Sequence, residues 1–293
     1  MRRTPEQKVL ARAAEEYIHF WIENGKYEMN VKKITDKNAA EVAVYTQLNE
    51  KQLKRFYEPQ EGIFICESIR VIKRAIEAGF QPRSFFVEDS MLEEVRQAWG
   101  DYPVPAYTMP YEFMKSITGY SLTGGVLSAM QRKPMPSVEE CILNASKIVV
   151  LDDIENPTNV GAIFRCAVAL GADAIVLTEG CADPLYRRAA RVSMGSVFKT
   201  KWTFVKSDIA GILRESGFES FALALSEEAE ELGSLNYGQS KRKAVILGNE
   251  DHGISKEIIS ECDHVVMIPM QHEVDSINVA AASAVAFWEI FKG

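Results

Sequence analysis

Three short polar segments in the second half of the chain each follow an apolar run, and their side chains could bind a ligand. In the first, residues 152–165, an N-P-T-N sequence forms a turn, and Asn159 can cap the helix that follows. Arg165 falls within the first two turns of that helix, where a guanidinium can hold a phosphate through two parallel hydrogen bonds. Taken alone, this segment would favour a surface salt bridge for Arg165.

The second segment contains Gly248 and Gly253, five positions apart and directly after an apolar run. Glycine allows the backbone to turn sharply and to approach a ligand closely. Such a turn would hold the carboxylate of Glu250 in a tight loop. A G-x-E-x-x-G string is weak evidence by itself and also fits an ordinary strand-to-helix turn, and His252 fits either a base or an exposed polar residue.

The third segment, residues 268–282, places Ser276 and Asn278 at the start of a predicted helix. A hydroxyl or an amide at that position caps the backbone and can also reach a ligand, and one of the two could act as a cap alone. All three segments follow predicted strands, and open α/β sheets bind their ligands at the carboxyl ends of strands.

The elements that must position these segments are strands and helices in alternation. The apolar runs are mostly continuous, which indicates strands buried on both faces and therefore a mostly parallel sheet with helices on both sides. A helix over residues 278–291 ends this half of the chain. The predicted strands cover residues 148–151, 174–177, 201–204, 220–225, 244–247 and 264–268.

The first half predicts a separate organisation. The pattern of residues 1–28 predicts an amphipathic helix that ends near Gly25, and Met29 could itself be a translation start, which would make this helix an extension. Residues 29–133 form a small α/β domain, with a strand, helix and strand between residues 63 and 87. Residues 134–146 form a linker containing two prolines, and residues 147–293 form the second domain.

Composition indicates a folded protein, because 47% of its 293 residues are apolar and 25% are charged. The sequence contains no apolar run of about 18 residues and no secretory signal, so we expect a cytoplasmic protein with no membrane partner. The five cysteines are widely spaced and form no C-x-x-C pair. The four histidines show no metal-ligand spacing, so we expect neither a disulfide framework nor a metal.

Charge restricts where a nucleic acid could bind. Residues 1–150 contain 20 basic and 20 acidic side chains, so the net charge of −8 lies in residues 151–293, with 13 against 21. Phosphate contacts require local basic clusters. Arg187, Arg188 and Arg191 form one, whereas the cluster at Lys241–Lys243 better fits a solvated turn before a strand.

Together the three segments resemble the SpoU, or TrmH, family of ribose methyltransferases within the SPOUT class. That family shows N-x-x-N-x-G-x-x-x-R, then G-x-E-x-x-G, then I-P-M followed by S-L-N-V. The corresponding sequences here are N-P-T-N-V-G-A-I-F-R (156–165), G-N-E-D-H-G (248–253), I-P-M (268–270) and S-I-N-V (276–279). Residues 183–195 also resemble the family, and residues 61–130 more weakly resemble the ribosomal-protein-like RNA-binding domain of many members.

Two departures from the family pattern are visible. Neither His272 nor Glu273 is the glycine that relatives usually have, which affects the expected shape of the cofactor loop. Ile277 replaces a leucine, which is a small change of shape at similar volume.

The resemblance implies S-adenosylmethionine as the cofactor, bound in a C-terminal trefoil knot. Gly248, Asn249, Ile268 and Ile277 would surround its adenosine part, with Leu225 and Met270 as further walls. Arg165 would hold a phosphate and activate a ribose 2'-hydroxyl, supported by Asn159, while Glu250, Ser276 and Asn278 orient the loops and the nucleotide. The implied partners are structured ribosomal or transfer RNA, not DNA, and a second copy of the chain in a homodimer.

Two alternatives stay open. The same fold could methylate an RNA base, or it could act without catalysis as an RNA-binding or ribosome-assembly protein. A nicotinamide-dependent oxidoreductase is disfavoured because no predicted strand is followed by G-x-G-x-x-G.

Overall fold

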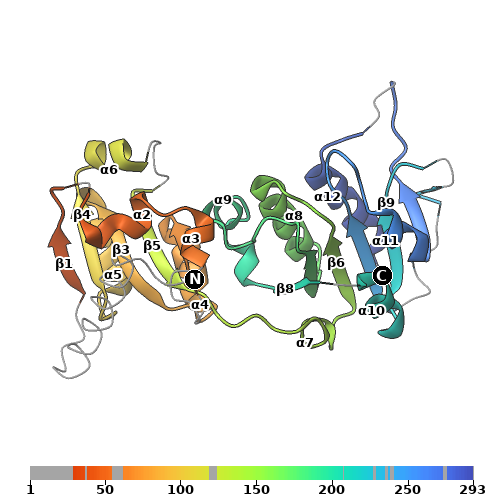
Figure 1. Ribbon diagram of the computed structural model, residues 1–293, viewed down its shortest axis with the longest axis horizontal. Coiled ribbons are helices and arrows are strands. Elements are labelled where there is room, and N and C mark those ends of the chain that lie inside the picture. The colour runs from red at the N-terminus through yellow and green to blue at the C-terminus, as the bar shows by residue number, and fades with distance from the viewer. Residues whose placement is uncertain are drawn as a thin grey trace. The chain divides into compact units, whose positions relative to one another are not determined.

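The computed structural model divides the chain into two compact units, residues 1–134 and 135–293. It describes residues 29–36, 38–54, 62–118, 124–206, 208–226, 229–234, 237, 241–272 and 276–292, with backbone alone for 116–118. The helix predicted over residues 1–28 lies outside this described part. Each unit has its own sheet (Figure 1).

The first unit contains a five-stranded mixed sheet. Its strand order is β1 (Asn30–Lys33), β4 (Pro105–Met109), β3 (Pro82–Glu88), β5 (Val126–Gln131) and β2 (Ile63–Glu67). Strand β5 runs antiparallel to both of its neighbours, and the remaining pairs are parallel. The helices are η1 (Ala40–Val42), α2 (Ala43–Thr46), α3 (Glu50–Lys54), α4 (Ile69–Glu77), η2 (Asp89–Met91), α5 (Leu92–Trp99) and α6 (Tyr111–Thr118).

The predicted strand, helix and strand between residues 63 and 87 are confirmed as β2, α4 and β3. Apolar side chains on one face of this sheet pack against the short helices over residues 40–54, which lie between β1 and β2 in the chain. Phe86 and Leu127 on the sheet share one buried cluster with Val42 and Leu53. Strand β1 and the helices over residues 40–54 were not predicted.

The second unit contains a seven-stranded sheet in which every pair of neighbouring strands is parallel. All six predicted strands are confirmed, and the short β10 was not predicted. The order is β10 (Glu230–Glu231), β12 (His264–Met267), β9 (Glu219–Leu223), β11 (Lys243–Leu247), β6 (Lys147–Leu151), β7 (Ala174–Thr178) and β8 (Lys201–Val205).

Helices cover both faces of this sheet because its central strands are apolar on both sides. Ile148 and Ile246 belong to a cluster with residues of α7 (Val138–Ile142), α10 (Ile209–Glu215) and α11 (Lys256–Glu261). Val149 and Leu247 point to the opposite face and are also fully buried. There α8 (Pro157–Ala169) packs against α12 (Val279–Ile290), α9 (Arg187–Val192) and η3 (Ser196–Phe198).

Three sequence predictions need correction. Asn159 does not cap α8, because the helix begins at Pro157 and its cap is Asn156, whose side chain accepts a hydrogen bond from the backbone NH of Thr158 at 2.9 Å. The segment 134–146, predicted as a linker, contains α7, and Ser137 and Glu140 form a reciprocal capping box at its start. The cluster at Lys241–Lys243 is not a solvated turn. Arg242 donates hydrogen bonds to three backbone carbonyls, and Lys243 is buried in β11 with its ammonium group 2.9 Å from the carbonyl oxygen of Ile290.

The buried Lys243 has a role at the end of the last helix. Lys147 lies beside Lys243 in register on β6 and donates to the carbonyl oxygen of Phe291 at 2.6 Å. The C-terminal carbonyls of a helix have no partners within the helix and carry partial negative charge, so two cations there stabilise it. The pair holds the C-terminal end of α12, while its N-terminal end lies at the carboxyl edge of the sheet.

Candidate active site

The three polar segments meet at the carboxyl edge of the second sheet. The side-chain amide of Asn159, on α8, donates a hydrogen bond to the carboxylate of Glu250, and that of Asn278 donates to Oδ1 of Asn159 at 3.2 Å. Asn159 is only 8% exposed. One buried amide therefore joins segments that lie 91 and 119 residues away in the sequence.

Asn278 also begins the last helix. Its Oδ1 accepts a hydrogen bond from the backbone NH of Ala280 at 2.9 Å, so Asn278 is the cap of α12, whereas Ser276 is exposed and precedes it. The cap oxygen and the amide nitrogen of Asn278 thus have separate partners. This arrangement fixes the side chain at the junction with Asn159.

The loop that contains Glu250 is held by its own hydrogen bonds. Asn249 and Gly253 exchange two backbone hydrogen bonds of 3.0 Å, and the side chain of Asn249 donates to the carbonyl oxygen of Asp153 at 2.7 Å. A Cβ atom at Gly248 would lie 2.3 Å from the backbone of Gly253, so only glycine fits there. The loop therefore presents Glu250 on a closely packed backbone.

A cavity of about 590 Å³ lies beside this junction. One side is apolar, with Leu225, Ile268 and Ile277 among its walls, and the Glu250 loop forms another. Leu225 is 62% exposed and Ile277 is 39% exposed, so both apolar side chains are accessible to a ligand in the cavity. Glu250, Ser276 and Asn278 line the cavity. So do all the residues predicted to bind the cofactor, which are Leu225, Gly248, Asn249, Ile268, Met270 and Ile277.

Sequence reasoning missed several residues of the cavity. Most are apolar and lie at strand ends or on helix faces, where the pattern is the same as that of core residues. Asp251 and His252 lie in the same segment as Glu250, where His252 fits either a base or an exposed polar residue, so their proximity to the cavity could have been expected. The remaining missed residues are Leu223, Ala224, Leu247, Gly253, Ile254, Ile259, Met267, Val279 and Ala282.

His272 is one of the two positions at which relatives usually have a glycine. His272 adopts a φ of +58°, in the left-handed region that glycine reaches without strain. Histidine is among the non-glycine residues found there more often than most. His272 therefore has a backbone conformation that favours glycine, and its side chain is exposed.

The predicted arginines lie outside the cavity. Arg165 is exposed on α8 and does not line it, and Arg187, Arg188 and Arg191 lie on α9. A Cβ atom at Gly161 would lie 2.5 Å from the carbonyl oxygen of Ala189, so α9 packs closely against the first turns of α8. The structure thus assembles the pocket within the chain and leaves Arg165 at the surface.

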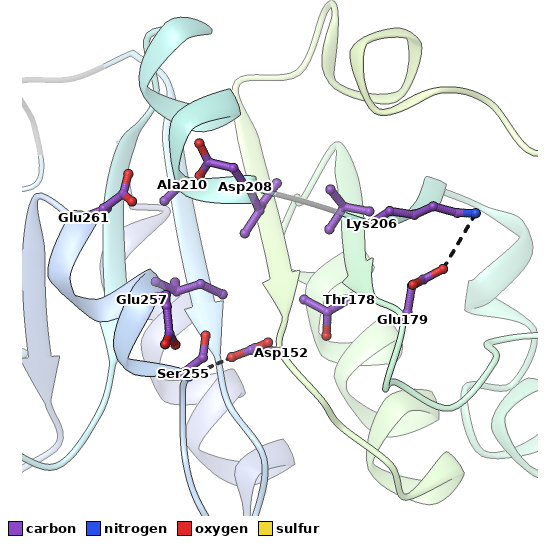
Figure 2. Close-up of a pocket in the computed structure, with 12 residues that line it drawn as sticks. Asp152, Thr178, Glu179, Lys206, Asp208, Ala210, Ser255, Glu257 and Glu261 are labelled. Carbon is purple, nitrogen blue, oxygen red and sulfur yellow. Dashed lines mark hydrogen bonds and ion pairs between the residues drawn. The ribbon is translucent and has the colours of Figure 1, made fainter.

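A second hollow, of about 250 Å³, lies at the ends of β6, β7 and β8 (Figure 2). Carboxylates dominate its polar side chains, and its one lysine, Lys206, lies 3.8 Å from Glu179. The buried Asp152 accepts a hydrogen bond from the backbone NH of Ser255 at 2.8 Å. This acidic hollow opposes the approach of phosphate groups. The carboxylates belong to Asp152, Glu179, Asp208, Glu257 and Glu261.

The buried Cys141 and Cys181 are not suited to nucleophilic chemistry at neutral pH. Burial raises the pKa of Cys181 to about 11, and its thiol donates to the carbonyl oxygen of Leu151 at 3.2 Å. Burial also raises the pKa of Cys141 to about 11. Among the described residues, no cluster of histidine, cysteine and carboxylate side chains could hold a metal ion, and no helix is long and apolar enough to cross a membrane.

Comparisons with known proteins agree with this arrangement. The sequence model of the SpoU rRNA Methylase family matches residues 146–288. A protein of Mycobacterium bovis named as an uncharacterized tRNA/rRNA methyltransferase is 32% identical over 264 residues, which are 89% of this chain and 92% of that protein. The 23S rRNA (guanosine(2553)-2'-O)-methyltransferase RlmP of Bacillus subtilis is 27% identical over 62% of this chain and 76% of its own length.

The fold also matches a solved structure. The crystal structure of an AdoMet-bound rRNA methyltransferase from Sinorhizobium meliloti superposes with a TM-score of 0.74 over 89% of this chain and 97% of that one, at 23% identity. The match extends over both sheets, and the first relative is similar over nearly the whole of both chains. The chain therefore belongs to the SpoU rRNA methylase family.

Proposed function

We propose that this chain transfers a methyl group from S-adenosylmethionine to a ribose 2'-hydroxyl of ribosomal or transfer RNA. The observation that supports this most directly is the junction of Asn159, Glu250 and Asn278 beside a cavity with one apolar side. Its volume of about 590 Å³ falls within the range of about 300–1,000 Å³ usual for small-molecule sites. The relatives named as rRNA and 2'-O-methyltransferases support the reaction class.

The pocket residues fit the two ends of this cofactor. Leu225, Ile268 and Ile277 offer apolar surface for the adenine, and the closely packed backbone at Gly248 bounds the same cavity. Glu250 and Asp251 place negative charge at the pocket, which favours a cationic sulfonium over a neutral thioether. When bound, S-adenosylmethionine supplies a methyl group already activated for transfer.

The chemical step needs positioning and removal of one proton. Bound S-adenosylmethionine would supply the methyl group to the ribose oxygen, with the neutral thioether as the leaving group, and the hydroxyl proton would leave to water or a nearby base. A guanidinium with a pKa above about 12 is a poor proton acceptor. Arg165 instead holds an RNA phosphate and stabilises the developing oxyanion, while Asn278 and Ser276 orient the nucleotide.

RNA contacts extend beyond the pocket in this proposal. Arg187, Arg188 and Arg191 on α9 contact the phosphate backbone near Arg165, because α9 packs on the helix that contains it. The first unit, which includes residues 61–130, binds a structured part of the same RNA. The C-terminal trefoil knot expected from the family is part of the proposal, with the segments 248–253 and 268–279 enclosing the cofactor.

A homodimer is also part of the proposal. Helix α12 exposes Val285 by 43% and Trp288 by 62%, and Ala281 lies one turn earlier on the same face. An apolar stripe on a helix at the surface is typical of a contact with a second chain. A second copy seated on this stripe would lie next to α8 and therefore next to Arg165.

The test is transfer of labelled methyl from S-adenosylmethionine to RNA lacking the modification, followed by digestion to nucleosides. We expect label in a 2'-O-methyl nucleoside with the wild type and at least a hundredfold less with Arg165→Ala. Label in a methylated base would favour the base-methyltransferase alternative. If the cofactor does not bind and no RNA is labelled, the non-catalytic RNA-binding alternative replaces this proposal.

A further inference from the structure

The basic side chains of the second unit are unevenly distributed. Residues 187–206 contain six of the 13 lysines and arginines found between residues 151 and 293, and none of the 21 acidic residues. This segment comprises α9, η3 and β8. An uninterrupted basic segment within an acidic half is the local feature that a phosphate-binding surface requires.

Many of the other cations in this unit have partners within the protein. Arg214 pairs with Glu261 at 3.2 Å, and Arg242 and Lys243 donate to backbone carbonyls, as does Lys147. In contrast, Arg188, Lys199 and Lys201 are exposed and form no ion pair with the described part of the chain. Their charges are therefore available to an external partner.

The segment begins beside the proposed active site. The backbone NH of Ala182 donates to the carbonyl oxygen of Ile154 at 2.9 Å, which ties the approach to α9 to the loop after β6. Gly161 then brings α9 against the first turns of α8, two residues after Asn159 and one turn before Arg165. From there the chain continues through η3, which also packs on α8, to β8 (Figure 1).

Strand β8 is the last strand of the sheet order, so one side of it has no strand partner among the described residues. Lys201 begins this edge strand, and Lys199 lies two residues before it. The hollow at the carboxyl ends of β6, β7 and β8 contains five carboxylates and disfavours RNA. Charge therefore separates a surface that attracts phosphate from a hollow that repels it.

We infer that Arg188, Lys199 and Lys201 form a phosphate-binding track for the RNA backbone, leading from the edge strand β8 to the region of Arg165. This inference rests on the proposed function and specifies how its substrate approaches. The contacts are to phosphates, so the track adds affinity and orientation without reading sequence.

The test compares two matched double variants of exposed lysines. Lys199→Ala/Lys201→Ala removes two charges from the track, and Lys241→Ala/Lys256→Ala removes two exposed charges elsewhere on the same unit. Because phosphate contacts are independent of sequence, the probe is a fluorescently labelled RNA hairpin, titrated between about 50 and 200 mM KCl. Isothermal titration with S-adenosylmethionine alone accompanies each protein.

The slope of the log of the RNA-binding constant against the log of the salt concentration is negative, and each lost phosphate contact should reduce its magnitude by about 0.7–0.9. The track variant should therefore have a slope smaller in magnitude by about 1.4–1.8. Arg188→Ala should reduce this magnitude further by a similar step. The control variant should keep the wild-type slope within about half a contact, and cofactor affinity should be the same in all the proteins.

A track variant with the wild-type salt slope, or a control variant with an equal loss, would overturn the inference. Failure of the proposed function is separate, because there the wild type itself would bind no S-adenosylmethionine and methylate no RNA. A wild type that methylates RNA together with an unaffected track variant would reject the track alone.

Discussion

Replacing Gly248 by alanine tests whether the loop backbone shapes the cofactor pocket. The added Cβ would lie 2.3 Å from both the carbonyl carbon of Gly253 and the backbone nitrogen of Ile254, about 1 Å short of ordinary contact at 3.4 Å. These are backbone atoms, and two hydrogen bonds between Asn249 and Gly253 hold them in place. Relief therefore requires the whole loop to move by about 1 Å.

Such overpacking typically costs about 1–3 kcal/mol of folding free energy. For a domain of this size each kcal/mol lowers Tm by about 2–4 °C, so Gly248→Ala should lower it by roughly 2–12 °C. The displaced loop also carries Glu250 away from Asn159. We expect affinity for S-adenosylmethionine to fall by about 10- to 100-fold, which corresponds to about 1.4–2.8 kcal/mol.

Gly233→Ala is the matched control, because a Cβ atom there would meet nothing within 4 Å. It should change the free energy of unfolding by no more than about 0.5 kcal/mol and leave cofactor affinity unchanged. The assays are calorimetric titration with S-adenosylmethionine and thermal unfolding. Wild-type affinity in Gly248→Ala would refute the reasoning that this backbone bounds the cofactor pocket.

Three further predictions concern side chains around the same sheet. Asn159→Ala removes the shared hydrogen-bond partner of Glu250 and Asn278, so kcat/KM for methyl transfer should fall by about 5- to 150-fold, or about 1–3 kcal/mol. An unchanged kcat/KM would contradict a role for the junction. Lys243→Met leaves the carbonyl oxygen of Ile290 without its buried donor and should lower the urea-unfolding free energy by about 1–3 kcal/mol, whereas Lys256→Met at the surface should not. At His264, burial lowers the pKa, but hydrogen bonds to Glu230 and Glu219 outweigh burial and raise the pKa above its ordinary 6.5. The stabilisation from the charged His264 should be fully present below pH 6.5 and lost as pH rises through the raised pKa. The difference in unfolding free energy between wild type and His264→Gln should therefore shrink from pH 5.5 to pH 8. A constant difference would contradict this charge contribution.

The parallel sheet could be predicted because its strands are buried on both faces. Val149 and Val150 point to opposite sides and are both fully buried, so the strand is apolar throughout and can be predicted without knowledge of its neighbours. The same reasoning fails for β10, which has only two residues and exists through its pairing with β12. It also fails for the helices over residues 40–54, each shorter than an isolated stable helix and held by packing on the sheet.

The polar residues of the candidate site could be predicted because they stand in recognisable motifs. Most of its apolar residues outside those motifs could not, because core residues show the same pattern. Glu250 and Asn278 follow strands in contexts that the family resemblance identifies, and the structure places both at the cavity. Leu223 and Met267 line the same cavity, yet in the sequence they are indistinguishable from core residues. Lys243 was misinterpreted because its partner, the carbonyl oxygen of Ile290, lies 47 residues away and cannot be inferred from neighbouring residues.

The exposure of its parts indicates how the proposed site works. Asn159 is buried and paired on both sides before any ligand arrives, so the cofactor half of the site is already ordered in the chain. Arg165 is exposed and does not line the cavity, and in the proposed function it contacts an RNA phosphate. Cofactor binding should therefore depend on the Asn159 junction and be independent of Arg165, while methyl transfer requires both. This separation follows because a preorganised pocket avoids the free-energy cost of ordering when the cofactor binds, whereas a long arginine side chain becomes ordered only with the substrate that it contacts.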